Sequence, residues 1–285
     1  MSFLNRIFGR NRRGSAEEKG IAEHMEYLNS LRQPALALRK SRERRFSRIG
    51  GLPNLPEALA WPQWKGKPLA FLCQLDLSDL PSEPRLPEFP RTGCLYFFYD
   101  QEQNAWGFDP QDKGSWQVLY VPDKMKDWPQ REVPQGLEKN AIYREKPVTF
   151  SLVQLYPDWQ DSRVQSLELG DRHMEEYLTL RDSVFADQPA HHLFGYPSPI
   201  QDNDMDLECQ LASNGLYCGD DLRDSDARRS KLEPGRIDWT LLLQLDTDDD
   251  TRMRWGDCGM LYFWIRKDDL KAGRFEDCWM ILQCS

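Results

Sequence analysis

The chain of 285 residues contains an internal repeat, and this repeat limits the possible folds more than any other feature of the sequence. Four short segments occur twice in the same order, with differences mainly in the lengths of the loops between them. The copies are residues 51–53 and 195–197 (GLP, GYP), 73–76 and 243–246 (CQLD, LQLD), 93–98 and 259–264 (GCLYFF, GMLYFW), and 116–119 and 279–282 (WQVL, WMIL). Short apolar and aromatic runs bounded by turn residues are typical of strands. Each copy therefore predicts a small antiparallel unit of three or four strands.

A sheet of three or four strands is too small to bury its own apolar face well. We therefore expect an α+β fold, in which duplicated antiparallel β-sheet units pack into one body with flanking helices. A helix is also predicted after Gly170, with apolar residues on one side and an end before Pro189. The expected divisions are a basic arm and helix at 1–48 and a domain at 49–285, with repeat units at about 49–122 and 193–285 and a connecting segment at 123–192.

Charge is unevenly distributed along the chain. Residues 1–50 carry 12 Lys and Arg against 5 Asp and Glu, which leaves 25 basic and 41 acidic residues in 51–285. The acidic body should repel nucleic acid and attract a basic protein partner, so we expect no sequence-specific nucleic-acid recognition. The alternative is that the acidic residues only keep the protein in solution.

The first residues are expected to form a separate basic arm. Residues 1–13 combine apolar residues with arginines, which predicts weak contact with a membrane surface or a partner; a frayed arm is the alternative. Ser15 and Glu18 form a capping box for a helix that Pro34 ends.

The cysteines and the absence of a signal peptide indicate a cytoplasmic protein. No apolar run is long enough to span a membrane, and residues 1–13 lack the pattern of a signal peptide. The seven cysteines are odd in number, lack Cys-x-x-Cys spacing, and include Cys73 and Cys94 within apolar runs. We therefore expect buried, reduced thiols.

The repeated strings and several others are similar to those of the YwqG-like family, a domain of unknown function. The similarity spans roughly residues 46–284. It implies a duplicated α+β fold and no established reaction, and members of such families also occur among immunity proteins of bacterial toxin systems. The strings are 50–53 (GGLP), 61–62 (WP), 68–77 (PLAFLCQLDL), 93–98, 193–197 (LFGYP) with Gln201, 242–246 (LLQLD), Trp255, Gly256, Asp257 and Gly259, 262–263 (YF), 269–270 (DL) and 283–284 (QC).

Two acidic clusters have the alternating spacing of a cation-binding loop. A calcium loop has glycine at its sixth position and usually glutamate at its twelfth. The runs that begin at Asp202 and Asp246 have Leu207 and Thr251 at the sixth position, and the second run has Asp257 at the twelfth. Arg252 and Arg254 add positive charge to the second run, which favours an ion-paired loop over a metal site. The weak metal candidates are Asp202, Asp204, Asp206, Asp248 and Asp250.

Gln74 and Gln244 occupy equivalent positions of the repeat, and each lies between apolar neighbours. A buried amide must be hydrogen-bonded, either to backbone groups or to a bound ligand. One hypothesis places a ligand in a cleft between the two halves; the alternative is that the repeated polar residues hold the turns at the strand ends. The cleft candidates are Gln74, Asp76, Gln244, Asp246, Trp255 and Asp257.

The sequence shows neither a nucleophile elbow nor a cysteine-protease context around its four histidines. We assign no catalytic residue and expect no cofactor. The first hypothesis is therefore a non-enzymatic interaction module of the immunity or antitoxin type, which neutralises a basic toxin by binding it. The alternative is a small-molecule or metal-binding protein, or an unrecognised enzyme, that uses the cleft between the repeats.

Overall fold

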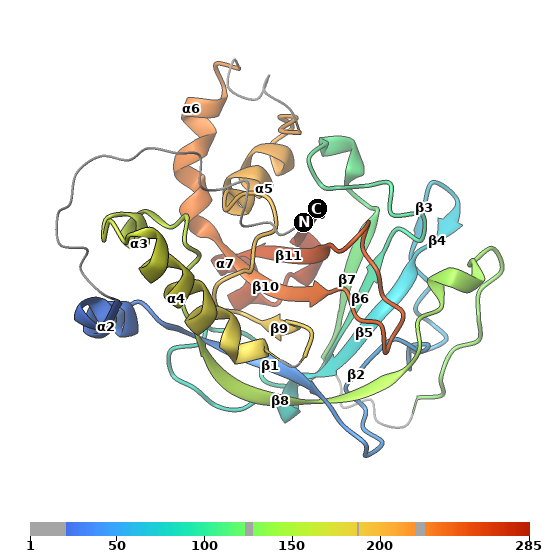
Figure 1. Cartoon of the computed structure of the whole chain (residues 1–285). Helices are drawn as coiled ribbons and strands as arrows, with labels where there is room; N and C mark the ends of the chain where they lie inside the picture. The colour runs from blue at the N-terminus through green and yellow to red at the C-terminus, as the bar shows by residue number, and fades with distance from the viewer. Residues whose placement is uncertain (1–20, 123–127, 187, 220–225) are drawn as a thin grey trace.

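The computed structural model describes residues 21–122, 128–186, 188–219 and 226–285. One antiparallel sheet of ten strands forms most of the molecule (Figure 1), and a short hairpin of β3 (Gln63–Trp64) and β4 (Lys67–Pro68) lies outside it. In spatial order, the large sheet contains β12 (Trp279–Gln283), β11 (Met260–Arg266), β10 (Trp239–Asp246), β9 (His192–Leu193), β1 (Gln33–Lys40), β8 (Lys146–Leu155), β2 (Arg48–Ile49), β5 (Ala70–Asp76), β6 (Cys94–Tyr99) and β7 (Trp116–Val121).

The sheet curls until its two edge strands meet, so that it is nearly closed on itself. Trp116 at the start of β7 and Trp279 at the start of β12 pack edge to face, with ring centroids 4.9 Å apart. The Trp116 indole donates a hydrogen bond to the Cys278 carbonyl (2.9 Å), and the Trp279 indole donates one to the Gly107 carbonyl (2.7 Å). The edges therefore meet through side chains and a neighbouring loop rather than through a continuous ladder.

Apolar side chains from both halves of the sheet fill its interior. Phe97 on β6 and Phe263 on β11 are both fully buried, and their rings pack edge to face at 5.2 Å. Leu75 and Leu245, at equivalent repeat positions on β5 and β10, belong to the same core. Burial of these side chains is the main source of stability for the curled sheet.

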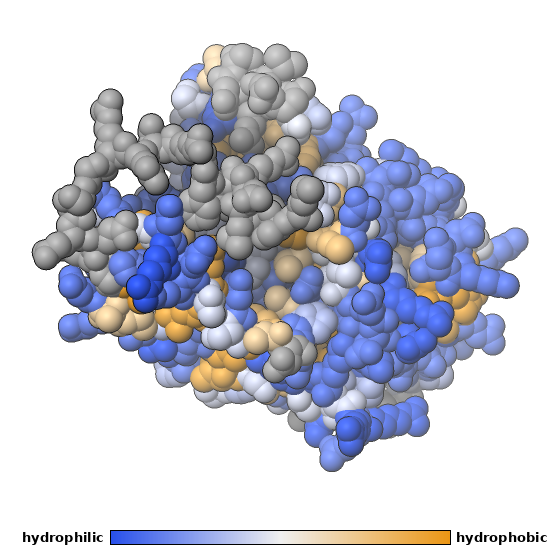
Figure 2. Space-filling model, in the orientation of Figure 1, coloured by the Kyte–Doolittle hydropathy of each residue, from blue (hydrophilic) through white to orange (hydrophobic). Residues whose placement is uncertain are grey.

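Helices and loops cover parts of the outer face. Helix α5 packs against β10 and β12, while α2 packs against α4, whose short continuation η4 contacts β8. In the view of Figure 2, hydrophilic side chains cover most of the right-hand part of the surface, and smaller hydrophobic patches lie on the left and at the right edge. The helices are α2 (Ile21–Ser30), α3 (Ser162–Gln165), α4 (Asp171–Asp182), α5 (Met205–Ser213), α6 (Arg229–Leu232) and α7 (Lys267–Ala272), and the longer-range packing also involves the 3-10 turns η4 (Ser183–Phe185), η6 (Glu233–Asp238) and η7 (Phe275–Asp277).

The strands predicted from the two repeat copies are present as β5, β6 and β7 and as β10, β11 and β12, and α4 follows Gly170. The fold is a mixed helix and strand body, as expected. The two predicted sheet units differ from expectation in their packing, because they continue into each other as one sheet instead of stacking as two. None of the described helices is both long and apolar enough to cross a membrane.

The segment before residue 48 contributes a central strand that the sequence analysis did not predict. Strand β1 pairs with β8 over eight residues and also with β9, and Leu36 and Leu38 on it are buried. Helix α2 is observed at 21–30. The predicted cap at Ser15 and Glu18 and the predicted contact through residues 1–13 lie outside the described residues.

Candidate functional site

Gln74 and Gln244 form the same set of hydrogen bonds in the two halves. Both side chains are fully buried. Each amide oxygen accepts a backbone N–H, from Asn54 at 2.9 Å and from Ser198 at 2.8 Å. Each amide nitrogen donates to a carbonyl 2.9 Å away, that of Phe46 or of Ala190. Each amide therefore joins its own strand, β5 or β10, to the residues just before and just after the neighbouring strand, β2 or β9. Neither amide points toward an open cleft.

A tyrosine repeats the same correspondence on the adjacent strand. The Tyr96 hydroxyl donates to the Asn54 carbonyl, and the Tyr262 hydroxyl donates to the Ser198 carbonyl, both at 2.7 Å. Tyr96 lies opposite Gln74, and Tyr262 lies opposite Gln244, in the same register. Both ladders also contain an irregularity two to three residues before the glutamine.

Arg48 and His192 are equivalent in position but differ in charge. The Arg48 guanidinium donates to the carbonyls of Phe46 and Leu52. The two ring nitrogens of His192 lie 3.0 Å from the Ala190 carbonyl and 3.1 Å from the Tyr196 carbonyl. Complete burial lowers the pKa of His192 to about 4, so that the ring is neutral at pH 7 and can donate to only one of these carbonyls.

Acidification should therefore destabilise the protein through His192. Its folded-state pKa of about 4 lies below the unfolded value of 6.5, so the unfolded chain binds the proton first and stability falls as the pH decreases from 6.5 toward 4. Between pH 7 and pH 5 this effect amounts to about 2 kcal/mol. Urea unfolding at both pH values should show a loss larger by about that amount in the native protein than in His192→Gln. Equal losses would mean that folding does not lower the pKa of His192.

The second histidine of the pair faces a different set of partners. His191 accepts a hydrogen bond from the Asp246 backbone N–H at Nδ1 (3.0 Å), while its Nε2 lies 3.5 Å from Asp248. In the first half the equivalent backbone group, that of Asp76, donates to the Ser47 hydroxyl at 3.0 Å. The two adjacent histidines therefore support separate parts of the structure.

The acidic residues of the second cluster are paired with a lysine from β1. The Lys40 ammonium lies 2.6 Å from Asp248 and 2.8 Å from Asp250. Burial favours the protonated acid at Asp248, but hydrogen bonds from His191 and Lys40 outweigh it and lower the pKa of Asp248. This lysine is supplied by the strand that was expected to belong to the arm.

In the first cluster, Arg236 takes the place that a cation would occupy. Its guanidinium lies 2.8 Å from Asp204 and 2.6 Å from Asp206, while Asp202 accepts the backbone N–H of Asp204 at 3.3 Å. Among the described residues, no group of three or more His, Cys, Asp or Glu side chains is placed to hold a metal ion.

The remaining cleft candidates lie in different environments. Asp76 is buried, and its carboxylate accepts hydrogen bonds from the backbone and hydroxyl of Ser78 (2.9 and 2.6 Å). Trp255 is fully buried between the rings of Tyr99 and Tyr143, and Asp257 is exposed. The six candidates therefore do not gather in one cleft.

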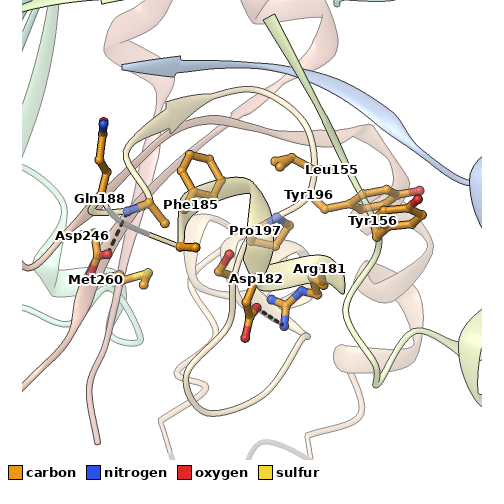
Figure 3. A pocket seen from close by; sticks show the side chains of 13 residues that line it. Leu155, Tyr156, Arg181, Asp182, Phe185, Gln188, Tyr196, Pro197, Asp246 and Met260 are labelled. Atoms are coloured by element: carbon orange, nitrogen blue, oxygen red, sulfur yellow. Dashed lines mark hydrogen bonds and ion pairs between the residues drawn. The ribbon is translucent and has the colours of Figure 1, made fainter. Parts of the chain in front are cut away.

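Asp246 lines a cavity that has a volume of about 350 Å³ (Figure 3). The cavity lies between α4 with η4, the end of β8, the segment after β9, and the facing ends of β10 and β11. Asp246 and Met260 lie on one side, and Arg181 and Asp182 lie on another. Its wall also contains Tyr156, Phe185 and Tyr196.

The charged groups of the cavity come from different elements. Asp246 is half-buried, accepts the Ala190 backbone N–H at 2.9 Å, and has a pKa raised by burial. Arg181 on α4 has only 12% of its side chain exposed and lies 3.1 Å from the buried carboxylate of Asp158. A carboxylate and a guanidinium thus face the same space from opposite chain segments.

The sequence did not lead us to Arg181 or to the correspondence between Arg48 and His192, although the spacing of residues in the sequence indicates both. Arg181 follows Tyr177 by four residues and precedes Phe185 by four, which places a charge on the apolar face of the predicted helix. The repeated GLP and GYP segments place position 48 against position 192.

Comparison with known proteins gives a family but no described activity. The profile of a family described as "Domain of unknown function (DUF1963)" matches residues 47–284. A search of curated proteins returns no match.

Proposed function

Because the chain belongs to the DUF1963 family, whose description assigns no activity, we propose from its residues that it is a cytoplasmic, non-enzymatic interaction module. The partner is a basic protein. In the narrower form of this proposal, the module is of the immunity type and neutralises a toxin by covering its surface, which accords with the proposed membership of the YwqG-like group.

The acidic charge of the body carries this proposal. Residues 51–285 contain 41 acidic and 25 basic residues. Asp257 and Asp268 are both exposed, on the loop before β11 and on α7. Complementary charge accelerates the encounter of two proteins and selects the partner, because long-range attraction acts before contact.

The buried polar residues form hydrogen bonds and ion pairs within the protein, which supports a binding role over a catalytic one. Gln74 and Gln244 use their amide groups to hold backbone segments in place. Lys40 and Arg236 neutralise the acidic residues around them. These side chains make a rigid framework, and rigid surfaces bind with a smaller loss of conformational entropy.

A duplicated origin of the two halves is part of the same proposal. The paired hydrogen bonds of Gln74 and Gln244 and of Tyr96 and Tyr262 support it, as does the positive φ shared by Gly51 (76°) and Gly195 (72°) in the repeated turns. The seven free cysteines support a reducing compartment.

The proposal is tested by co-expression with the basic protein encoded next to this chain. A stable complex should form, and its association rate should fall at least about tenfold between about 50 mM and about 500 mM salt. The double substitution Asp257→Lys and Asp268→Lys should slow association, and the corresponding double substitution to Asn should slow it less. The proposal fails if the neighbouring genes encode no basic partner, or if a complex forms at a rate that salt does not change.

A further inference from the structure

The cavity beside Asp246 presents two carboxylates, those of Asp246 and Asp182, and the guanidinium of Arg181 to the same partly open space. Asp246 lies at the end of β10, and Arg181 lies on the last turn of α4. Apolar groups of Leu155, Phe185 and Met260 also line it. We propose that this cavity binds an α-amino acid with an apolar side chain, with the ammonium at Asp246 and the carboxylate at Arg181. The proposal concerns a small ligand and does not depend on the protein partner proposed above.

Asp246 is suited to accept an ammonium group. Its Oδ2 atom accepts the Ala190 N–H at 2.9 Å, and the carboxylate also accepts the Thr247 backbone N–H; the remaining lone pairs of the two oxygens can accept from a ligand. Asp246 is half-buried, and a hydrogen bond to a charged group is stronger where water is partly excluded. Met260, directly opposite Asp246 on β11, forms the adjacent apolar wall.

Arg181 is suited to bind the carboxylate. Its ion-pair contacts with Asp158 (3.1 Å) and Asp182 (3.9 Å) are both measured at one terminal nitrogen, Nη1. A guanidinium has five N–H groups and binds a carboxylate with two of them, so Nη2 and Nε can serve a ligand while Asp158 holds Nη1. The buried Asp158 thereby keeps Arg181 in place.

The size and remaining surface of the cavity agree with such a ligand. A volume of about 350 Å³ is at the small end of the range for ligand pockets, about 300–1,000 Å³. A ligand with an ammonium group alone would make no use of Arg181, and a ligand with a carboxylate alone would make no use of Asp246. An amino acid satisfies both ends of the cavity, and its side chain can pack on Phe185 and Met260.

The test uses the full chain and isothermal titration with L-leucine, L-methionine, L-valine and L-phenylalanine. At least one should bind with a dissociation constant below about 1 mM and raise the melting temperature. For that amino acid, the methyl ester lacks the carboxylate and the deaminated acid lacks the ammonium. Each should bind at least about tenfold more weakly than the amino acid itself.

Two variants locate the binding to this cavity. Asp246→Asn keeps an oxygen for the Ala190 N–H but removes the charge, and it should weaken binding about tenfold or more. Met260→Trp should block binding by filling the cavity. Asp171→Asn, which removes an exposed charge at the other end of α4, should bind as the native chain does. Urea unfolding of each variant verifies that it is folded.

The proposal is overturned if the folded chain binds none of the four amino acids. It is also overturned if the ester or the deaminated acid binds as tightly as the amino acid, because one charge would then be sufficient. Binding that survives in folded Asp246→Asn and Met260→Trp would place the ligand elsewhere and would likewise reject the site.

Discussion

Substitution of Gly107 by alanine should lower the free energy of unfolding by about 3 kcal/mol or more. Gly107 is buried where the two edges of the curled sheet meet, and its carbonyl accepts the Trp279 indole N–H at 2.7 Å. A Cβ atom at this position would overlap the carbonyl oxygen of Met280, which is backbone of β12 and cannot turn aside. The φ of 87° also disfavours any residue with a Cβ.

Gly66 provides a matched control for this substitution. Its φ of 79° is similar, but no atom lies within 4 Å of the position where its Cβ would be built. Gly66→Ala should therefore cost only the left-handed strain, about 1 kcal/mol. Urea unfolding of both variants separates strain from collision. Similar losses in the two would show that the edges of the sheet move apart without appreciable cost at Gly107.

The repeat predicted the strands of each half because their pairing is local. β5, β6 and β7 follow one another along the chain, as do β10, β11 and β12, so the apolar pattern of each strand and the turns between them are sufficient to predict these strands.

The sequence match of the third repeated segment differs by one residue from the register in the sheet. The sequence match aligns Val118 with Ile281, whereas in the sheet Val118 pairs with Phe97 as Met280 pairs with Phe263. The paired tryptophans Trp116 and Trp279 dominate the sequence match, but the register is set by the ladder.

Strand β1 could not be predicted in the same way. Its pairing with β8 joins residues more than a hundred positions apart, such as Leu36 and Leu152. Alanines at 35 and 37 have a low strand propensity, and the basic residues that follow suggested an exposed arm. Only the partner strand shows that Leu36 and Leu38 face a core and that Lys40 meets Asp248.

The candidate site was predicted only at the positions that the repeat marked. Equivalence of Gln74 and Gln244 predicted a shared structural environment, and their hydrogen bonds are indeed matched. The cavity lies beside Asp246, where residues of α4 and η4 face the end of β10. A feature that occurs in one half, such as the position of Arg181, cannot be deduced from a repeat.

Replacement of Trp255 by alanine should lower the free energy of unfolding by about 3–5 kcal/mol. The side chain is fully buried, and its ring packs edge to face with those of Tyr143 (5.6 Å) and Tyr99 (6.2 Å). Its indole also donates a hydrogen bond to the Asp246 carbonyl at 3.2 Å. Truncation would leave a cavity beside the two tyrosine rings and would remove the indole donor from the Asp246 carbonyl beside the proposed ligand site.

Trp255→Phe separates the contribution of the ring from that of the hydrogen bond. Phenylalanine retains most of the packing with Tyr99 and Tyr143 but cannot donate to Asp246, so its loss should be about 1–2 kcal/mol. Urea unfolding monitored by circular dichroism measures both variants without depending on the fluorescence of the removed tryptophan. A loss in Trp255→Ala no larger than that in Trp255→Phe would contradict this account. In that case the neighbouring rings must close the space, and Trp255 would not be what holds the loop between β10 and β11 against the end of β10.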